Sequence, residues 1–240
     1  MTWLRSLAFN VYFFGGLTIF LISMLVVLPF PAIAMERSVR AWSHSVRLGL
    51  KYLAGLDYEV RGAENIPDRP AIFASKHQST WETVAFVWMF PSPIYVLKIE
   101  LLSIPLWGWY ARKCSQVAVD RQGGGAALKQ MVRDCRAALK MGRHLIIFPE
   151  GTRSAPGEEG SYHPGVAALY SQLDAPVVPV ALNSGVFWGR RGFAKKPGKV
   201  VVEFLPPIPP GLERKTFMRE LIGQVEGTSN RLIAESEPAG

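Results

Sequence analysis

Residues 71–90 read AIFASKHQSTWETVAFVWMF, and their character changes twice along this short stretch. The segment 71–76 is short and mostly apolar, which favours a buried β-strand. A polar stretch, HQST, follows at 77–80 and ends the apolar run. The segment 80–90 is apolar again and follows Ser79, a residue type that favours helix starts, so we expect a helix there. A strand, a polar loop and a helix in this order form the building unit of α/β folds.

The same alternation continues along the chain from residue 58. Short apolar or β-branched runs predict strands at 58–62, 71–76, 93–98, 116–120, 144–150, 177–183 and 200–205. Longer segments predict helices at roughly 80–90, 101–112, 124–141, 164–173 and 214–235. Several of the strands are nearly all apolar, as expected for a sheet that is covered on both faces. The predicted fold class is therefore α/β.

An apolar segment precedes this domain. No charged residue occurs from Ser6 to Met35. At about 1.5 Å rise per residue, a helix over 7–28 could cross a hydrocarbon core of about 30 Å. We therefore expect a membrane-anchoring helical region at 1–57 and an α/β domain at 58–240. A cleaved signal peptide is the alternative, although the apolar run is longer than a typical signal core. Spanning and insertion into one leaflet both stay open.

Charge is distributed unevenly around the apolar run. Only Arg5 precedes it, whereas Arg37, Arg40 and Arg47 follow it, beside an apolar stripe in 39–53. That second segment predicts an amphipathic helix that lies in the membrane interface or packs on the domain. If the first run spans, the charge bias places the remaining chain on the cytoplasmic side of the inner (plasma) membrane. The net charge of +8 suits anionic lipid or a phosphorylated substrate, and we expect no nucleic-acid partner.

A second basic segment combines cations with aromatic rings. Residues 184–199 read SGVFWGRRGFAKKPGK and contain five basic residues but no acidic one. Aromatic rings and cations together are typical of the membrane interface. We expect this loop to touch the membrane or an acyl carrier through Trp188, Arg190 and Arg191. A solvated hairpin with a packed tryptophan is the alternative.

Metal and disulfide chemistry is not predicted. Cys114 and Cys135 lack the spacing of a metal or redox motif, and two cysteines form no disulfide framework. The candidate metal ligands also lack a recognised spacing. They are His77, Glu82, His144, Glu150 and His163. We therefore expect no metal site and two unpaired thiols.

Polar clusters follow four predicted strands, where function gathers in α/β sheets. The first cluster begins with His77, and Glu82 follows five residues later. On a continuous helix these side chains would diverge by roughly 140°, so they can meet only if the chain turns between them. A carboxylate that orients a histidine would make it a general base. Alternatively, Ser79 and Glu82 form a capping box that closes the helix start.

The order of the clusters carries a resemblance. His77 and Glu82 are followed by KIEL at 98–101, Asp-Arg at 120–121, FPEGTRS at 148–154 and VVPVAL at 177–182. This pattern resembles the glycerolipid acyltransferases, specifically the 1-acylglycerol-3-phosphate (lysophosphatidate) acyltransferases, over roughly 58–210. The resemblance implies a mixed sheet flanked by helices behind the N-terminal membrane-anchoring segment.

The resemblance also implies an activity. A fatty acyl group would pass from acyl-CoA or acyl-carrier protein to the free hydroxyl of a lysophospholipid, giving phosphatidate, with no cofactor. His77 would act as general base and Glu82 would orient it. Because a thiolate leaves easily, no protein nucleophile is required, although Ser79 could accept the acyl group. Alternatives are another lysophospholipid or lyso-aminolipid acceptor, a non-enzymatic lipid-binding protein, and a hydrolase.

The stretch 148–154 is expected to hold the lipid phosphate. Arg153 offers a planar fork for phosphate oxygens. Gly151 lets the backbone approach a ligand closely, and Thr152 lies between them. Lys98 and Arg121 follow two other strands and are further candidates, although Arg121 could pair with its neighbour Asp120, and Arg153 could make a structural salt bridge. Glu150 would repel phosphate, so we expect it to hold Arg153 or a backbone amide.

Two positions depart from the pattern of the family. The residue that orients the histidine is usually aspartate, whereas this chain has Glu82. Its extra methylene still allows it to reach His77 with a modest shift. Lys76 stands where asparagine is common, and we expect it to add positive charge near the phosphate or the acyl carrier.

Overall fold

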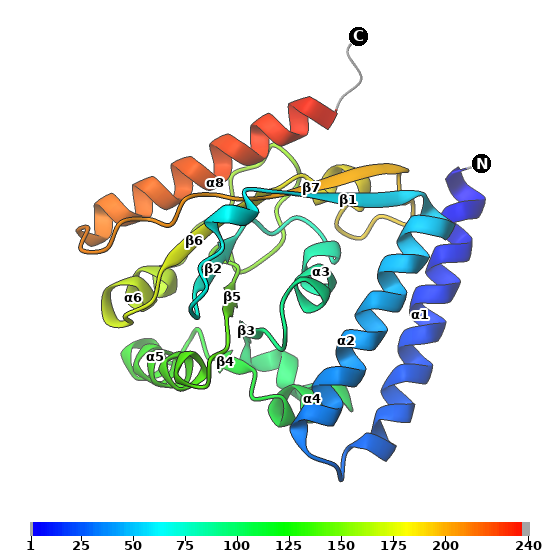
Figure 1. Cartoon of the computed structure of the whole chain (residues 1–240), viewed down its shortest axis with the longest axis horizontal. Coiled ribbons are helices and arrows are strands. Elements are labelled where there is room, and N and C mark those ends of the chain that lie inside the picture. The colour runs from blue at the N-terminus through cyan, green and yellow to red at the C-terminus, as the bar shows by residue number, and fades with distance from the viewer. Residues whose placement is uncertain (1, 237–240) are drawn as a thin grey trace.

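The structure is a computed structural model that describes residues 2–236. Its centre is a seven-stranded sheet with the order β1-β7-β6-β2-β5-β3-β4 (Figure 1). The strands are β1 Leu56–Arg61, β2 Ile72–Ser75, β3 Ile94–Lys98, β4 Val117–Val119, β5 Leu145–Ile147, β6 Val177–Leu182 and β7 Gly198–Phe204. All seven strands predicted from the sequence are confirmed. The last four residues of the domain predicted at 58–240 lie outside the described residues.

The sheet is mixed, as the resemblance implied. Five adjacent strands, β6, β2, β5, β3 and β4, run parallel to one another. Strand β7 pairs antiparallel with β6, and β1 runs parallel to β7. The carboxyl ends of the five parallel strands therefore lie at one edge of the sheet. This edge is where the polar clusters of the sequence come together.

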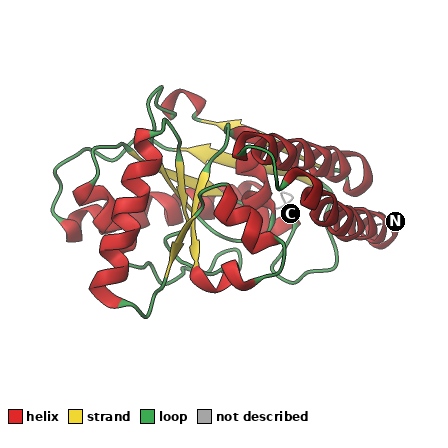
Figure 2. Ribbon diagram, turned by 90° about the horizontal axis from the view of Figure 1, so that it is seen from below, coloured by secondary structure: helices red, strands yellow, loops and turns green. Residues whose placement is uncertain are grey.

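Helices cover both faces of the sheet (Figure 2). They are α1 Thr2–Val27, α2 Ala32–Gly49, α3 Trp81–Met89, α4 Trp107–Lys113, α5 Gly124–Lys140, α6 Gly165–Gln172, α7 Ser184–Phe187 and α8 Arg214–Ser236. Side chains of α5, α6 and α8 share one core cluster with Ile72. Side chains of α1, α2 and α3 share the opposite cluster with Phe73. The alternation of Ile72 and Phe73 thus buries both faces of β2, which explains why this strand is apolar throughout.

One predicted helix is interrupted. The segment predicted as a helix at 101–112 forms a 3₁₀ turn, Ile99–Ser103, and then the separate helix α4. Pro105 lies between them and lacks the N–H group that a continuous helix would need. Leu106 follows with a φ of 62°, a left-handed conformation that a helix interior does not tolerate. The chain therefore turns at this point before α4 begins.

The N-terminal region is a helical hairpin. Helix α1 is long and apolar enough to cross a membrane, and α2 returns alongside it (Figure 1). A π-helical turn, Leu50–Ala54, continues α2, and Gly55 ends it with a φ of 73°. Phe9 and Phe13 of α1 are buried against the domain. Much of the remaining apolar surface of α1 faces outward: Trp3, Leu4, Val11, Phe14, Ile19, Ile22 and Val26 are exposed.

The basic aromatic segment docks on α1. Trp188 is only 6% exposed, and its ring meets Phe9 and Phe13 edge-on at 5.4 Å from each. Lys195 is also buried and donates from Nζ to Asn10 Oδ1 at 2.8 Å; burial lowers the pKa of this lysine to about 8. The expectation that Trp188 reaches a membrane or a carrier is therefore wrong, because the ring is occupied by packing inside the protein. Arg190 and Arg191 remain exposed.

Candidate active site

His77 lies just beyond β2, where the chain turns before α3 begins. This turn brings Glu82 back to the histidine, and Nδ1 of His77 lies 2.8 Å from Glu82 Oε1. The predicted pairing therefore forms, even though the two residues are five apart. The methylene that distinguishes glutamate from aspartate does not prevent it. The departure at position 82 thus preserves contact with the base.

The carboxylate of Glu82 has further partners. Its Oε1 accepts the backbone N–H groups of Gln78 at 2.7 Å and Ser79 at 2.6 Å. Its Oε2 accepts the hydroxyl of Ser184 at 2.7 Å. Glu82 is fully buried, and these contacts fix its orientation. The contact with the Ser79 N–H is the one that the capping interpretation predicted, so one carboxylate serves both roles.

The helix start itself differs from the expectation. The residue that caps α3 is Thr80, one position later than predicted, and its side chain makes no capping hydrogen bond. The Ser79 hydroxyl instead accepts the N–H of Trp81 at 3.1 Å. Ser79 is fully buried and does not line the cavity described below. Its hydroxyl is therefore poorly placed to accept an acyl group.

The histidine ring is held in one orientation. It stacks on Phe148 with a centroid separation of 4.1 Å. Because the carboxylate of Glu82 only accepts hydrogen bonds, Nδ1 of His77 carries the proton toward it. The other ring nitrogen, Nε2, then has a free lone pair. His77 lines the cavity, so this nitrogen can take a proton from a bound hydroxyl.

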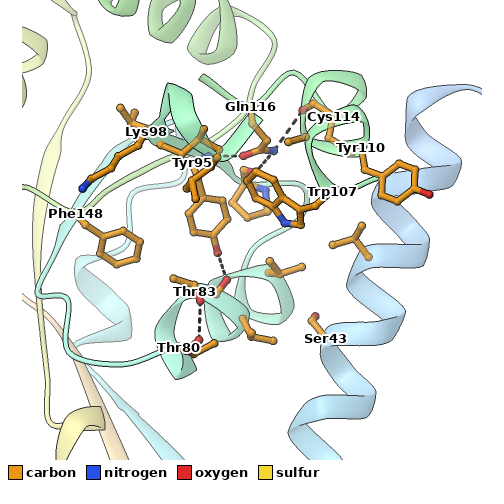
Figure 3. A pocket seen from close by; sticks show the side chains of 18 of the residues that line it. Ser43, Thr80, Thr83, Tyr95, Lys98, Trp107, Tyr110, Cys114, Gln116 and Phe148 are labelled. Carbon is orange, nitrogen blue, oxygen red and sulfur yellow. Dashed lines mark hydrogen bonds between the residues drawn. The ribbon is translucent and has the colours of Figure 1, made fainter. Parts of the chain in front are cut away.

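A cavity of about 580 Å³ adjoins the histidine. Figure 3 shows Lys98 and Phe148 toward one side of it and Tyr110 and Cys114 toward the other. Much of its wall is apolar and comes from helices α1 to α4: Phe13, Leu17, Phe20, Leu21, Val39, Trp42, Val84, Val87, Trp107 and Ala111. The cavity is thus a channel that joins the end of the sheet next to His77 to the N-terminal hairpin.

Cations line the polar part of this channel. Lys98 is the last residue of β3, Arg121 follows β4 and Arg153 follows β5. All three line the cavity together with Arg190. Among the described residues, none of these four cations forms a salt bridge with a carboxylate. The alternatives of an Asp120 pair and a structural salt bridge are therefore not realised. Unneutralised cations at one rim are suited to an anionic ligand.

The position of Arg121 depends on Gly151. Gly151 has a φ of 64°, and a Cβ there would lie 2.1 Å from Arg121 Nη2. Only glycine therefore allows the guanidinium to lie against this turn. Burial lowers the pKa of Arg121. Burial lowers the pKa of His163, and the nearby charges of Arg121 and Lys98 lower it further.

Arg153 and Thr152 also face the channel. Arg153 Nη1 donates to the hydroxyl of Thr80 at 2.9 Å. Arg190 in turn donates to the carbonyl of Arg153 at 3.0 Å. Thr152 is exposed and lines the same cavity. The turn at 151–153 therefore lines the cavity beside the same cations.

Two charged residues beside the site, Glu150 and Lys76, face away from it. Glu150 Oε1 accepts the backbone N–H of His77 at 2.9 Å, which confirms that Glu150 holds a backbone amide and not Arg153. Lys76 is 1% exposed and donates to Glu150 and Glu226. The expectation that Lys76 adds charge near the phosphate or the carrier is therefore wrong. Adjacent residues of an extended segment point to opposite faces, which directs Lys76 away from the channel.

Sequence reasoning missed two residues of the site. Ser184 donates to Glu82, and Gln78 Oε1 accepts the N–H of Gly185 at 3.0 Å. Ser184 follows β6, so the rule that placed Lys98 and Arg121 at this edge could have found it. Ser184 was instead assigned to the basic aromatic segment 184–199, so it was not considered as a site residue.

The remaining candidate ligands do not gather. The described residues contain no group of three or more His, Cys, Asp or Glu side chains placed to hold a metal ion. Cys114 and Cys135 are both free and buried. Burial raises their pKa values to about 11 and about 12, so neither is poised as a thiolate nucleophile.

Known proteins are similar to this chain in sequence and in fold. The sequence model of the family described as Acyltransferase matches residues 57–183. A 1-acyl-sn-glycerol-3-phosphate acyltransferase from Pseudomonas aeruginosa is 36% identical over 232 residues, which are 97% of this chain and 89% of that protein. A 1-acyl-sn-glycerol-3-phosphate acyltransferase from Limnanthes alba is 30% identical over 77% of this chain and 66% of that protein. The crystal structure of the 1-acyl-sn-glycerophosphate (LPA) acyltransferase from Thermotoga maritima matches with a TM-score of 0.69 and 25% identity, over 98% of this chain and 95% of that one.

Acyl transfer from a thioester to a hydroxyl needs a base and room for a long apolar chain. The His77–Glu82 pair and the apolar cavity beside it fit these needs, and the match to the family model defines an enzyme of the acyltransferase class. The chain belongs to the Acyltransferase family. The resemblance that the ordered motifs carried is thereby confirmed.

Proposed function

We propose that this acyltransferase transfers a fatty acyl group to the free hydroxyl of 1-acylglycerol-3-phosphate and forms phosphatidate. The donor is a thioester, acyl-CoA or acyl-carrier protein. One observation carries the proposal: a histidine held by Glu82 lies between a rim of unneutralised cations and an apolar channel. The names of the relatives from Pseudomonas aeruginosa and Limnanthes alba support the same acceptor.

The chemistry follows from the orientation of His77. Its Nε2 takes the proton as the acceptor oxygen attacks the thioester carbonyl. The tetrahedral intermediate then collapses, the carbon–sulfur bond breaks, and the ester remains on the lipid. The thiolate leaves with the electron pair of that bond and takes up the proton held by His77. Glu82 stabilises the imidazolium between these two steps, because its carboxylate faces Nδ1.

The phosphate of the acceptor would bind at the cationic rim. Arg121 and Arg153 supply planar donors, and Lys98 supplies a third positive charge at the same edge. Because His77 lines the same cavity as these cations, a phosphate bound there would leave the glycerol hydroxyl on the side of the histidine. Acceptors without a phosphate would leave these cations unpaired and would be used poorly.

The apolar part of the channel would hold an acyl chain. Helix α3 lines it at successive turns through Thr80, Val84 and Val87. At about 1.5 Å rise per residue, Val87 lies about 10 Å beyond Thr80 along the helix axis. The helix therefore marks distance from the catalytic end, and side chains farther along it would limit the length of the chain.

We also propose that residues 1–57 attach residues 58–240 to the cytoplasmic side of the inner membrane. The outward face of α1 is apolar, and α2 carries Arg37, Arg40 and Arg47 beside it. Since Leu17 and Phe20 of α1 line the channel, a lipid acceptor could enter directly from the membrane. The charged residues of α2 along α1 favour insertion into one leaflet over a free span.

The acceptor assignment is tested with purified protein and a panel of lysolipids. We expect labelled phosphatidate from lysophosphatidate, and at least tenfold lower kcat/KM with lysophosphatidylcholine or a lyso-aminolipid, because these acceptors lack a free phosphate monoester. Acyl-CoA and acyl-carrier protein are compared as donors of one chain length. Release of free fatty acid without a diacyl product would identify a hydrolase instead. Equal use of all acceptors would refute the role of the cationic rim.

The channel assignment predicts a change in chain-length preference. Val87→Phe is expected to fill part of the channel and lower kcat/KM for long donors about tenfold, while shorter donors keep their rate. Each methylene excluded from an apolar site costs about 0.8 kcal/mol, so two of them account for this factor. Competition between donors of different length measures the preference. Val87→Ala serves as the matched control and should move the preference in the opposite direction; parallel shifts in both variants would contradict the assignment.

A further inference from the structure

A fully satisfied buried ammonium lies directly beside the catalytic histidine in sequence. Lys76 Nζ donates to Glu150 Oε2 at 3.0 Å, to the carbonyl of Glu158 at 2.9 Å and to Glu226 Oε1 at 2.8 Å. An ammonium has three N–H donors, and each has a partner here. Lys76 is 1% exposed, and Glu150 and Glu226 are 2% and 8% exposed. Such a cluster is expensive to bury unless it is fully paired.

The cluster joins segments that are far apart in the chain. Lys76 follows β2, Glu150 follows β5, and Glu226 belongs to α8. Tyr162 adds a fourth attachment by donating its hydroxyl to Glu226 Oε1 at 2.8 Å. Burial and the charge of Glu226 raise the pKa of this tyrosine, so the hydroxyl keeps its proton and remains a donor. Neither Lys76 nor Glu226 lines the channel.

The cluster reaches the catalytic residue through its backbone. Glu150 uses Oε2 for Lys76 and Oε1 for the backbone N–H of His77 at 2.9 Å. Ser154 donates its N–H to the carbonyl of His77 at 2.9 Å and its hydroxyl to Glu150 Oε2 at 2.6 Å. Both backbone groups of His77 are therefore held by the segment that Glu150 begins. The ionised form of Glu150 is the one that accepts all these bonds.

We propose that Lys76 and Glu226 are positioning residues for His77. Lys76 bridges Glu150 and a second buried carboxylate, Glu226, and Glu226 anchors Lys76 to α8. Glu150 then fixes the backbone of His77, while Glu82 fixes its ring. Measuring this role by turnover rests on the acyl transfer proposed above. The placement of the His77 ring itself does not depend on that proposed function.

The charge balance makes the proposal testable. Without Lys76, Glu150 and Glu226 would be two buried carboxylates with no cation between them, and they would repel each other. Displacement of Glu150 would weaken its hold on the His77 N–H. Replacing Glu226 by glutamine in the same variant removes the second charge. The amide introduced there can donate an N–H toward Glu150 in place of the lost ammonium.

We expect Lys76→Met to lower kcat about ten- to hundredfold with little change in KM for the lysolipid, since losing an outer residue that orients a functional group has effects of this size. The double variant Lys76→Met/Glu226→Gln should recover most of that loss. Glu226→Gln alone should lower kcat less than Lys76→Met does, because its amide oxygen can still accept from Lys76. All rates are measured below the melting temperature of the least stable variant.

The double variant separates positioning from stability. If the cluster only stabilises the fold, removing two members costs more than removing one, and the double variant will be no faster than Lys76→Met. That result, or an unchanged kcat in Lys76→Met, would overturn the proposal. A KM that rises while kcat holds would also overturn it, because it would place Lys76 at the acceptor site.

A second readout needs no turnover. Carbethoxylation of His77 by diethyl pyrocarbonate, followed by peptide mass spectrometry, reports how well its ring is held against Phe148. We expect faster modification in Lys76→Met and a return toward the wild-type rate in the double variant. If the wild type makes no diacyl product while this pattern holds, the proposed function fails and the positioning role stands. If the wild type is active but the variants do not differ in this way in their modification rates, the positioning role is refuted and the proposed function stands.

Discussion

Replacing His77 by alanine is expected to lower kcat by about a hundredfold to ten-thousandfold, the range that a positioned general base contributes. The ring makes one side-chain hydrogen bond, to Glu82, and one stacking contact, with Phe148. Its loss should therefore leave the fold intact, and circular dichroism with thermal melting can check this. Initial rates at saturating donor and acceptor measure kcat.

The acceptor should still bind to this variant. Lys98, Arg121 and Arg153 supply the charge at the rim, and none of them bonds to the ring of His77. KM for the acceptor should therefore change little while kcat falls. His44→Ala is the matched control, because His44 lies on α2 outside the cavity and should keep full activity. Retention of more than a tenth of wild-type kcat by His77→Ala would remove the general-base role.

The position of the site was predictable from the strands alone. His77, Lys98 and Arg121 each follow a short apolar run, and parallel strands bring such positions to one edge. The pairing of His77 with Glu82 was not decidable locally, because spacing allowed either a cap or a histidine partner. The structure shows why both interpretations had merit: a carboxylate has enough lone pairs to accept from the ring and from the Ser79 N–H together.

The residues that sequence reasoning misplaced depend on distant partners. Lys76 looked like an active-site cation because of its neighbour, but its partner Glu226 is 150 residues away. Trp188 was expected to contact the membrane from its local sequence, but its ring packs against Phe9 and Phe13 of α1. Local composition carries no information on such contacts. The break at Pro105, in contrast, was visible in the sequence, and the helix predicted at 101–112 did not take it into account.

Glu82→Gln is expected to lower kcat by about a hundredfold to a thousandfold while the protein stays folded. The amide oxygen can occupy the place of Oε1 and accept the same N–H groups, and the amide nitrogen can donate to Ser184. The negative charge that stabilises the imidazolium is lost, however, and the amide can also favour the wrong tautomer. Hydrogen bonds to a neutral acceptor are weaker, so stability should fall by only about 1 kcal/mol.

Glu82→Ala separates the two roles of this carboxylate. It leaves the N–H groups of Gln78 and Ser79 buried without an acceptor, and each unpaired group costs about 1–3 kcal/mol of stability. The melting temperature should therefore fall sharply. If orientation of His77 is the main role, Glu82→Gln will have nearly normal stability and a kcat close to that of His77→Ala. If capping is the main role, Glu82→Gln will have nearly normal kcat, and only Glu82→Ala will be impaired. Because Oε1 contacts Nδ1 of His77 and both N–H groups at once, we expect the first result for glutamine and loss of both properties for alanine.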